Sequence, residues 1–308
     1  SIDIIVHGAT GYTGQRVVKH LAQSQPQLNI AICGRSKTKL AAVANNIGWG
    51  DEGKCASNIF VIEDVVNELD DLVVAFSKAK IVIACAGPYR QIGMPILKAA
   101  MDAKCDYLDL CGEPQFFDDA LVAFDRQARN DGLLAVHAAA FDCVPAELGA
   151  SLAERELLNR YKKNSEGNVD CAGIEVIHTM QNVSSANATT FHAAVDGFYA
   201  ASTGELKASR KKVKENYPEF DQTKPPTRPS NWPKVPGTPG AIMPGYNDEL
   251  GLRTMKFVGA DASAIRSSWR YLRSRIPDHK RKGMEIAEPR LSVLIGLDGK
   301  ETTAAMKV

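Results

Sequence analysis

The stretch Ile2-Asp-Ile-Ile-Val-His-Gly8-Ala-Thr-Gly11-Tyr-Thr-Gly14 decides the fold of this chain of 308 residues. It reads as a short apolar strand that runs into glycines at three-residue spacing, and the helix-like segment Gln15 to Ala22 follows. In a dinucleotide-binding turn, one glycine permits the tight turn, the next lets backbone N–H groups approach a pyrophosphate, and the last lets helix and strand pack closely. Because the first N–H groups of a helix are unpaired and favour negative charge, we expect the phosphates there.

The spacing of these glycines is GxxGxxG rather than GxGxxG, and a glycine triplet alone also fits a turn without a ligand. The position of the triplet favours a cofactor site, since a second apolar strand, Asn29 to Gly34, arrives after one helix length, as a βαβ unit requires. The residues that we expect to form this turn around the cofactor are Gly8, Thr10, Gly11, Tyr12, Thr13 and Gly14.

The end of the second strand indicates which dinucleotide is bound. NAD sites usually place an acidic residue there for the ribose 2′-hydroxyl, whereas NADP sites place an arginine near the 2′-phosphate. Here Arg35, Ser36 and Lys39 follow the strand, and no acidic residue occurs between Asn29 and Lys39. The cluster also fits a solvated basic helix start, but positive charge opposes the helix dipole, so a bound anion explains it better. The sequence therefore predicts NADP(H).

Alternation of strands and helices continues through the first half of the chain. We expect helices at 94–102 and 117–131, and further strands at 58–62, 80–86, 105–110 and 133–138. Continuous apolar strands separated by helices predict an α/β fold, a Rossmann-type doubly wound parallel sheet over residues 1–150. Its carboxyl edge should carry Gly8, Arg35, Asp64, Gly87 and Gly112.

The pattern changes after residue 150, and we expect a second, mixed α+β domain over residues 151–308. A long strand is expected at 169–181, a helical pattern at 188–214, and a hairpin formed by 291–297 and 302–308. The segment 218–245 is predicted to be a proline-rich loop, because eight prolines fall between Pro218 and Pro244. The chain stops within an apparent strand, so we expect the C-terminus to be incomplete.

Composition narrows the class of protein. Lys and Arg total 37 against 36 Asp and Glu, which gives no electrostatic case for nucleic acid. The seven cysteines form no CxxC pair and indicate a reducing compartment. No apolar run reaches the roughly 20 residues that span a bilayer. We expect an intracellular protein of the cytoplasm, of an organelle interior such as a mitochondrion or plastid, or of a lipid surface. Peripheral membrane contact, a homodimer and a larger assembly stay open.

Three side chains are candidates for catalysis because each follows the end of a parallel strand. Tyr89 comes after the loop Ala86-Gly87-Pro88, Glu113 follows Gly112, and Asp142 follows the sixth strand. Each also has a structural interpretation: Tyr89 packs a loop, Glu113 caps the next helix, or Asp142 anchors a turn before Pro145. We expect His137 to be a hydrogen-bonded core histidine, and the sequence suggests no partner for His178 or His192. No motif of a metal site occurs.

Five motifs in order, GATGYTG, CGRSKTKL, GPYRQIGMPILKAA, YLDLCGEPQF and AFDCVPAELG, resemble the saccharopine dehydrogenase-like oxidoreductases. This broad family includes trans-acting enoyl reductases. The resemblance implies phosphate contacts at Gly8, Gly11 and Gly14, 2′-phosphate contacts at Arg35 and Ser36, and a nicotinamide loop at Gly87, Pro88 and Tyr89. It also implies a second domain that covers the crevice and can mediate dimerisation.

The chain departs from the family pattern at Ala140-Phe-Asp-Cys143, where members often have Gly-Phe-Asp-Ser. Two functions therefore follow. One is an NADP(H)-dependent reductase that transfers hydride to a small or lipid-like enoyl or carbonyl substrate. The other is a catalytically silent structural or assembly subunit that retains bound NADP(H).

Overall fold

The computed structural model describes residues 2–49, 58–141, 143–162, 171–179, 188–218, 245–247, 251–257, 259–274 and 289–297. The chain divides into two compact units. The first consists of Ser1–Ala140 and Ala188–Val213, and the second of Phe141–Asn187 and Lys214–Val308.

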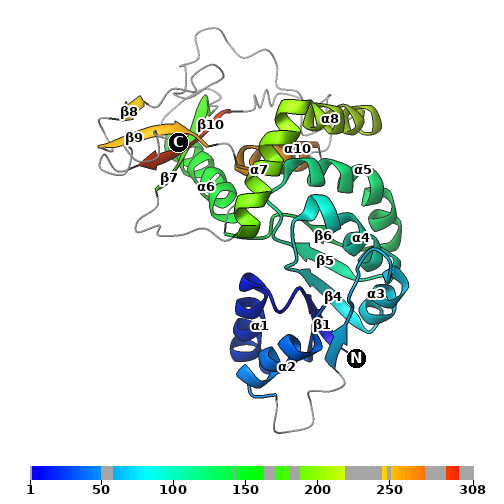
Figure 1. The fold of residues 1–308 in the computed structure, drawn as a ribbon. Coiled ribbons are helices and arrows are strands. Elements are labelled where there is room, and N and C mark those ends of the chain that lie inside the picture. The colour runs from blue at the N-terminus through cyan, green and yellow to red at the C-terminus, as the bar shows by residue number, and fades with distance from the viewer. Residues whose placement is uncertain are drawn as a thin grey trace. The chain divides into compact units, whose positions relative to one another are not determined.

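A six-stranded parallel sheet forms the centre of the first unit (Figure 1). Its strand order is β3-β2-β1-β4-β5-β6, so the order reverses between β1 and β4, where ligands of such sheets bind. The strands are β1 (Ile2–His7), β2 (Ile30–Gly34), β3 (Ile59–Val61), β4 (Ala79–Ala84), β5 (Asp106–Asp109) and β6 (Ala135–Val136). The expected doubly wound parallel fold is confirmed.

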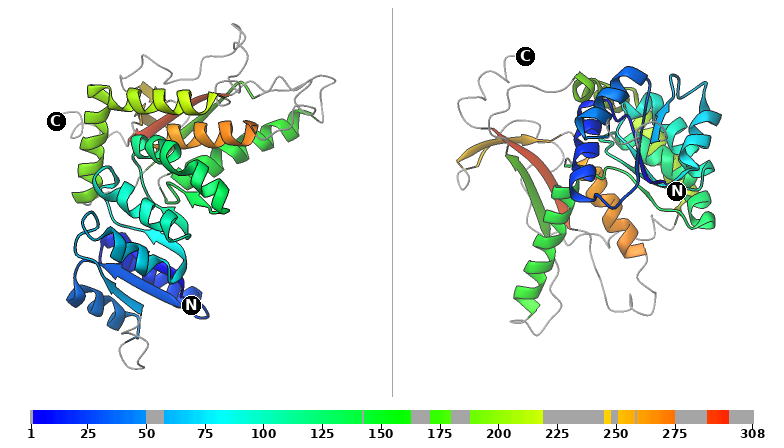
Figure 2. Two further views of the ribbon diagram at one scale, coloured as in Figure 1. Left: turned by 90° about the vertical axis from the view of Figure 1, so that its right-hand side faces the viewer. Right: turned by 90° about the horizontal axis from the view of Figure 1, so that it is seen from below.

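Helices cover both faces of this sheet because its strands are apolar on both sides (Figures 1 and 2). On one face, Ile4 and Val6 of β1 pack with Val18 and Leu40 of the first two helices. On the other face, Ile5 lies in a cluster with Phe76 and helices further along the chain. The helices are α1 (Tyr12–Ser24), α2 (Lys37–Asn46), α3 (Leu69–Phe76), α4 (Tyr89–Asp102) and α5 (Pro114–Asp131).

The five residues that we expected at the carboxyl edge each follow the carboxyl end of a parallel strand: Gly8, Arg35, Asp64, Gly87 and Gly112. Helix α4 differs from the expectation, because it begins at Tyr89 rather than Met94. The cause is a distant cap: the carboxylate of Glu113 accepts hydrogen bonds from the first two N–H groups of the helix.

Two further helices belong to the first unit although they come later in the chain. They are α7 (Ala188–Thr203) and α8 (Glu205–Asn216), and Gly204 separates them with a φ of +83°. Arg90 of α4 pairs with Glu205, and Asp119 of α5 accepts a hydrogen bond from Ser209. These contacts fix α8 against the first unit.

The second unit is built on a mixed four-stranded sheet with the order β7-β10-β9-β8. Strand β10 pairs parallel with β7 and antiparallel with β9. Apolar side chains of the sheet pack with Ala146 and Ala150 of α6 and with Ile265 and Trp269 of α10. The elements are α6 (Cys143–Lys162), β7 (Gly173–Thr179), β8 (Gly245–Asn247), β9 (Leu252–Lys256), α10 (Asp261–Ser274) and β10 (Arg290–Leu297).

Some of our expectations fall on residues outside the described ranges. They include residues 219–244 of the proline-rich loop, residues 302–308 of the hairpin, and Asp142. Among the helices of the described residues, none is both long and apolar enough to cross a membrane.

Candidate functional site

The glycine turn between β1 and α1 is closed to any larger side chain. Gly8 has a φ of +76°, and a Cβ there would lie 2.8 Å from the backbone nitrogen of Ala86. A Cβ on Gly14 would lie 2.2 Å from the carbonyl oxygen of Gly8. Helix α1 therefore begins directly against β1, with no acidic residue in its first turn. This turn has the close packing that a dinucleotide pyrophosphate requires.

The end of β2 presents positive charge beside the start of α2. Ser36 is the N-cap of α2, and its hydroxyl oxygen accepts the backbone N–H of Lys39 at 3.4 Å. The first turn of the helix has no acidic residue. Arg35 is exposed, and its guanidinium has no ion-pair partner among the residues that the structure describes. Arg35, Ser36 and the start of α2 together form a corner, called the Arg35 corner below. This corner fits an anion such as a 2′-phosphate.

The other predicted cofactor residues lie on loops at the same sheet edge. After β3, the Asp64 carboxylate accepts the N–H groups of Val66 and Asn67 at 2.9 and 3.1 Å, which lowers the pKa of Asp64 below its usual 3.8. Ala86, Gly87 and Pro88 connect β4 to α4, with a cis bond between Gly87 and Pro88. Contact of these residues, and of Gly112, with a cofactor stays a prediction.

Tyr89 is held by backbone groups on both sides of its hydroxyl. The hydroxyl donates to the carbonyl oxygen of Ala84 at 2.6 Å and accepts the N–H of Leu110 at 3.3 Å. Only 5% of the residue is exposed. Burial, and then the negative charge of Asp109, raise the pKa of Tyr89 above its usual 10. This hydroxyl joins the ends of β4 and β5.

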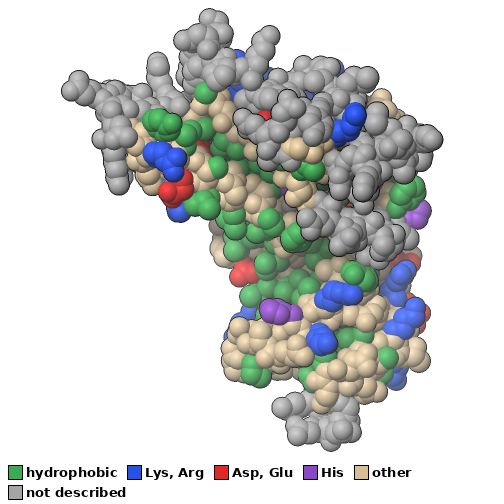
Figure 3. Space-filling model, turned by 90° about the vertical axis from the view of Figure 1, so that its left-hand side faces the viewer, with side chains coloured by type: hydrophobic (Ala, Val, Ile, Leu, Met, Phe, Trp, Pro, Cys, Tyr) green, Lys and Arg blue, Asp and Glu red, His purple; other side chains and the backbone are tan. Residues whose placement is uncertain are grey.

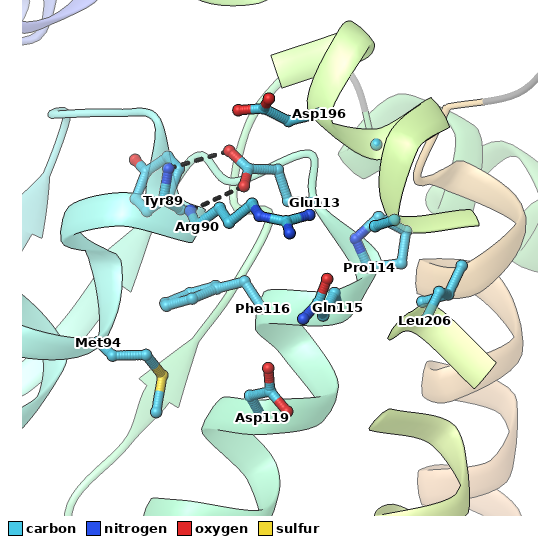
Figure 4. Close-up of a pocket in the computed structure, with 12 residues that line it drawn as sticks. Tyr89, Arg90, Met94, Glu113, Pro114, Gln115, Phe116, Asp119, Asp196 and Leu206 are labelled. Atoms are coloured by element: carbon cyan, nitrogen blue, oxygen red, sulfur yellow. Dashed lines mark hydrogen bonds between the residues drawn. The ribbon is translucent and has the colours of Figure 1, made fainter. Parts of the chain in front are cut away.

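Glu113 is buried and caps α4. Its Oε1 and Oε2 accept the N–H groups of Tyr89 and Arg90 at 2.9 and 2.8 Å (Figure 4). Burial raises the pKa of Glu113 above its usual 4.5, and the negative charge of Asp196 acts in the same direction. The two N–H donors oppose this shift. Glu113 thus caps α4, the helix before it, whereas we expected it to cap the helix that follows, where its side chain makes no cap hydrogen bond.

A pocket with a cavity volume of about 70 Å³ lies within the first unit beside these residues. Helices α4, α5, α7 and α8 form it, and Figure 4 shows Arg90, Glu113 and Asp196 near Phe116 and Leu206. Arg90 also lies over the ring of Tyr199 at 5.6 Å. The pocket offers apolar surface together with a few polar groups, as small-molecule sites do.

Sequence reasoning missed the partner of His137. The Nδ1 atom of His137 lies 2.6 Å from Oδ2 of Asp109, the last residue of β5. The expected hydrogen bond of His137 is therefore present, and its partner is a buried carboxylate at the carboxyl edge. The pairing could have been predicted from the sequence, because Asp109 and His137 lie at the carboxyl ends of neighbouring parallel strands.

The second unit contains a similar pair that the sequence did not suggest. His178 at the end of β7 hydrogen-bonds through Nε2 to Asp261, the first residue of α10. The Cys143 thiol donates to the other oxygen of Asp261 at 3.5 Å. Burial raises the pKa of Asp261 above its usual 3.8. Our expectation that His178 lacks a partner was wrong, because 83 residues separate it from Asp261.

Within the described ranges, no three His, Cys, Asp or Glu side chains are placed to hold a metal ion.

Comparison with known families identifies the first unit. Residues 4–136 match the saccharopine dehydrogenase NADP-binding domain. The matched segment contains the glycine turn, the Arg35 corner and the loop after β4.

Curated relatives extend the match over the second unit. The lipid droplet localized protein of Caenorhabditis elegans is 32% identical over 96% of this chain and 66% of its own length. The human saccharopine dehydrogenase-like oxidoreductase is 28% identical over 87% of this chain and 59% of its own length. A Mycobacterium tuberculosis protein named as a trans-acting enoyl reductase is 29% identical over 58% of this chain and 45% of its own length. The chain thus spans between about half and two thirds of the length of these relatives.

Proposed function

The chain belongs to the saccharopine dehydrogenase-like family, and we propose that it is an NADP(H)-dependent reductase of an enoyl or carbonyl substrate. The glycine turn with the adjacent Arg35 corner is the observation that carries the proposal. Both features are intact, and both are built as a phosphorylated dinucleotide requires.

The residues of the first unit fit NADP(H) in detail. Gly8 and Gly14 leave room only for backbone at the turn, so the N–H groups at the start of α1 can hold the pyrophosphate. Arg35 and Ser36 would hold the 2′-phosphate. When bound, the reduced nicotinamide supplies a hydride. The family resemblance assigns its place to the loop of Gly87 and Pro88, which leads into the pocket of Figure 4.

The pocket of the first unit is our candidate substrate site. Tyr89 and Arg90 begin α4 and line the pocket, so the substrate would lie beside the loop that precedes them. Met94, Phe116 and Leu206 offer apolar contact for a carbon chain, while Arg90 and Glu113 offer a donor and a carboxyl group. The names of the nematode and mycobacterial relatives agree with a lipid-like enoyl substrate.

NADPH oxidation by the full chain tests the proposal. We expect absorbance loss at the nicotinamide band with at least one of a panel of 2-alkenals, enoyl thioesters and ketones. Glu113→Gln should slow turnover with little change in NADPH affinity, because its carboxyl lies at the pocket. Asp142→Asn tests the remaining candidate in the same assay. Absence of turnover with every substrate, despite tight NADPH binding, would contradict the reductase.

A second function is supported by the hydrogen bonds of Tyr89 and Glu113. The hydroxyl of Tyr89 and both oxygens of Glu113 already bond backbone groups. This arrangement supports a catalytically silent subunit that retains NADP(H) for structural reasons. For such a subunit, NADPH raises the unfolding temperature, and no substrate of the panel is reduced.

Peripheral contact with a lipid surface is proposed for α6 and for Phe141, which lies two residues before it. Phe141 is 91% exposed, and Leu148 and Leu152 are 63% and 50% exposed, opposite the buried Ala146 and Ala150. Figure 3 looks onto the side where Figure 1 shows β7, β9 and α6, and hydrophobic side chains gather there. The nematode relative is named for lipid droplets.

Flotation with phospholipid-coated triolein droplets tests this contact. Placing charge at Leu148 and Leu152 together, each by Leu→Asp, should lower the bound fraction at least about tenfold, since burial of each side chain contributes roughly 1.5–3 kcal/mol. Val74→Asp is the matched control, because Val74 is 57% exposed on α3. Equal loss in both variants, or no loss, would contradict a role for α6.

A further inference from the structure

Two polar side chains at the carboxyl edge of the parallel sheet have no part in the cofactor site described above. Asp109 is the last residue of β5, and His137 directly follows β6. The two strands are neighbours in the sheet. Ligands of such sheets bind beyond the carboxyl ends of the strands. Both side chains therefore lie at the edge where a substrate would be bound.

The Asp109 carboxylate holds the His137 ring in one orientation. Its Oδ2 lies 2.6 Å from Nδ1 of His137, and its Oδ1 accepts the N–H groups of Cys111 and Ala138, each at 3.0 Å. The Asp109 side chain is fully buried. Because a carboxylate oxygen accepts in a hydrogen bond, Nδ1 is assigned the hydrogen. The Nε2 atom is then the nitrogen left for proton exchange.

The backbone beside His137 is bent to make these contacts. Ala138 has a φ of +55°, in the left-handed region that alanine rarely adopts. This conformation lets the N–H of Ala138 reach Asp109 Oδ1, and the next N–H, of Ala139, donates to the Asp109 carbonyl at 2.7 Å. Strained residues persist where the surroundings fix them, and they cluster at functional sites.

Aromatic rings hold the imidazole on its other sides. The centroids of Phe116, Tyr107 and Phe117 lie 5.2, 5.8 and 6.2 Å from that of His137. Asp109 and Tyr107 of β5 are titratable groups that contact the ring, and Phe116 and Phe117 of α5 pack against it. Burial and the charge of Asp109 raise the pKa of Tyr107 well above 10, so this phenol stays neutral.

The ring is nevertheless partly exposed. The His137 side chain is 20% exposed, and Phe116, which packs edge-on against it, lines the pocket. An imidazole with one nitrogen fixed by a buried carboxylate and a partly exposed ring is the arrangement of acid–base histidines.

We infer that His137 is the proton donor of the proposed reductase and that Asp109 is its positioning residue. This inference rests on the proposed function. His137 would give its Nε2 proton to one atom of the substrate double bond, while bound NADPH would supply the hydride to the other atom and leave as NADP⁺. The double bond would become a single bond, and the neutral imidazole would regain a proton from water. Asp109 stabilises the imidazolium without taking its proton.

Turnover of the full chain with NADPH and the substrate panel is the first test. His137→Gln should lower kcat about 10²- to 10⁴-fold, the usual contribution of a general acid, with NADPH affinity changed less than about threefold. Added imidazole should partly restore turnover to His137→Ala. Asp109→Asn should shift the pH profile of kcat, and Asp109→Glu should recover part of the loss. His178→Gln, which breaks the similar pair of the second unit, is the control and should retain the wild-type pH profile.

Nitrogen NMR of histidine-labelled protein gives a readout that needs no turnover. In the neutral form His137 should carry its hydrogen on Nδ1, and Asp109→Asn should change this tautomer. Saturating NADP⁺ should move the Nε2 resonance of His137 and leave that of His178 in place.

The two tests separate the inference from the proposed function. Reduction by wild type with unchanged turnover in His137→Gln overturns the inference and leaves the reductase standing. Absence of reduction by wild type overturns the reductase, and the NMR result then decides the site. A His137 resonance that NADP⁺ does not move, or a hydrogen on Nε2, overturns the assignment of His137.

Discussion

Each unit of the molecule contains a buried aspartate paired with a partly exposed histidine, and the two pairs differ in what surrounds the carboxylate. Asp109 in the first unit accepts two backbone N–H groups besides His137. Asp261 in the second unit accepts the Cys143 thiol besides His178. The first pair lies at the carboxyl edge of a parallel sheet, whereas the second joins α6, β7 and α10 of the second unit. The same chemical pair thus lies at a sheet edge in one unit and links a strand to two helices in the other.

The largest expected effect tests whether nucleotide binding belongs to the first unit alone. Gly14→Ala should reduce NADPH affinity by more than about 100-fold, because the new Cβ would lie 2.2 Å from the Gly8 carbonyl oxygen and must displace the turn that holds the pyrophosphate. Fluorescence titration with NADPH measures the change. Gly149→Ala on α6 is the control, since a Cβ there meets nothing within 4 Å. Retained affinity in Gly14→Ala would contradict the assigned turn.

The next effect concerns the choice between cofactors. Arg35→Ala should weaken NADPH binding by about 1.5–3 kcal/mol, roughly 10- to 150-fold, because a charge-assisted phosphate contact is lost. NADH, which has no 2′-phosphate, should bind with nearly unchanged affinity. Arg155→Ala in the second unit removes an exposed arginine of the same kind and should change neither titration. Equal losses for both dinucleotides would place Arg35 away from the 2′-phosphate.

The sequence predicted the first unit better than the second, because more of the contacts in the first unit join residues with a local sequence pattern. In the first unit each strand end carries its own signal, so the parallel sheet and the residues at its carboxyl edge could be predicted. The start of α4 could not, because its cap, Glu113, comes 24 residues after Tyr89. Likewise, no local pattern showed that α7 and α8 pack with the first unit. In the second unit, the hydrogen bonds of Asp261 with Cys143 and His178 join three segments that share no local pattern.

A smaller expected effect is the change in unfolding free energy when an alanine of each unit is replaced by glycine. Ala138→Gly should raise the free energy of unfolding by about 0.5–1 kcal/mol, because glycine adopts a φ of +55° without the strain that alanine has there. Ala153→Gly, at an exposed helical position of α6, should lower it by up to about 1 kcal/mol. Urea unfolding measures both. A loss of stability in Ala138→Gly would show that the left-handed conformation is not a source of strain.

The smallest effect is a difference in titration between carboxyl groups of the two units. Burial is the first cause that raises the pKa of Glu113 above 4.5 and that of Asp261 above 3.8. Asp64, whose carboxylate accepts two backbone N–H groups at the surface, should instead titrate below 3.8. Carbon NMR of the three carboxyl carbons against pH measures the order directly. Titration of Glu113 or Asp261 below the usual value would contradict the described burial.

The sign of the linked stability follows from the same shifts. A carboxyl whose pKa is raised by folding binds its proton more tightly in the folded state. The stability that Glu113 and Asp261 contribute is therefore fully present below their unfolded values, about 4.5 and 3.8, and is lost as pH rises through the higher folded values. Relative to wild type, Glu113→Gln and Asp261→Asn should gain stability as pH rises through these windows. If only Asp261→Asn behaves in this way, the two N–H donors at Glu113 outweigh its burial, and the carboxylates of the two units differ in kind.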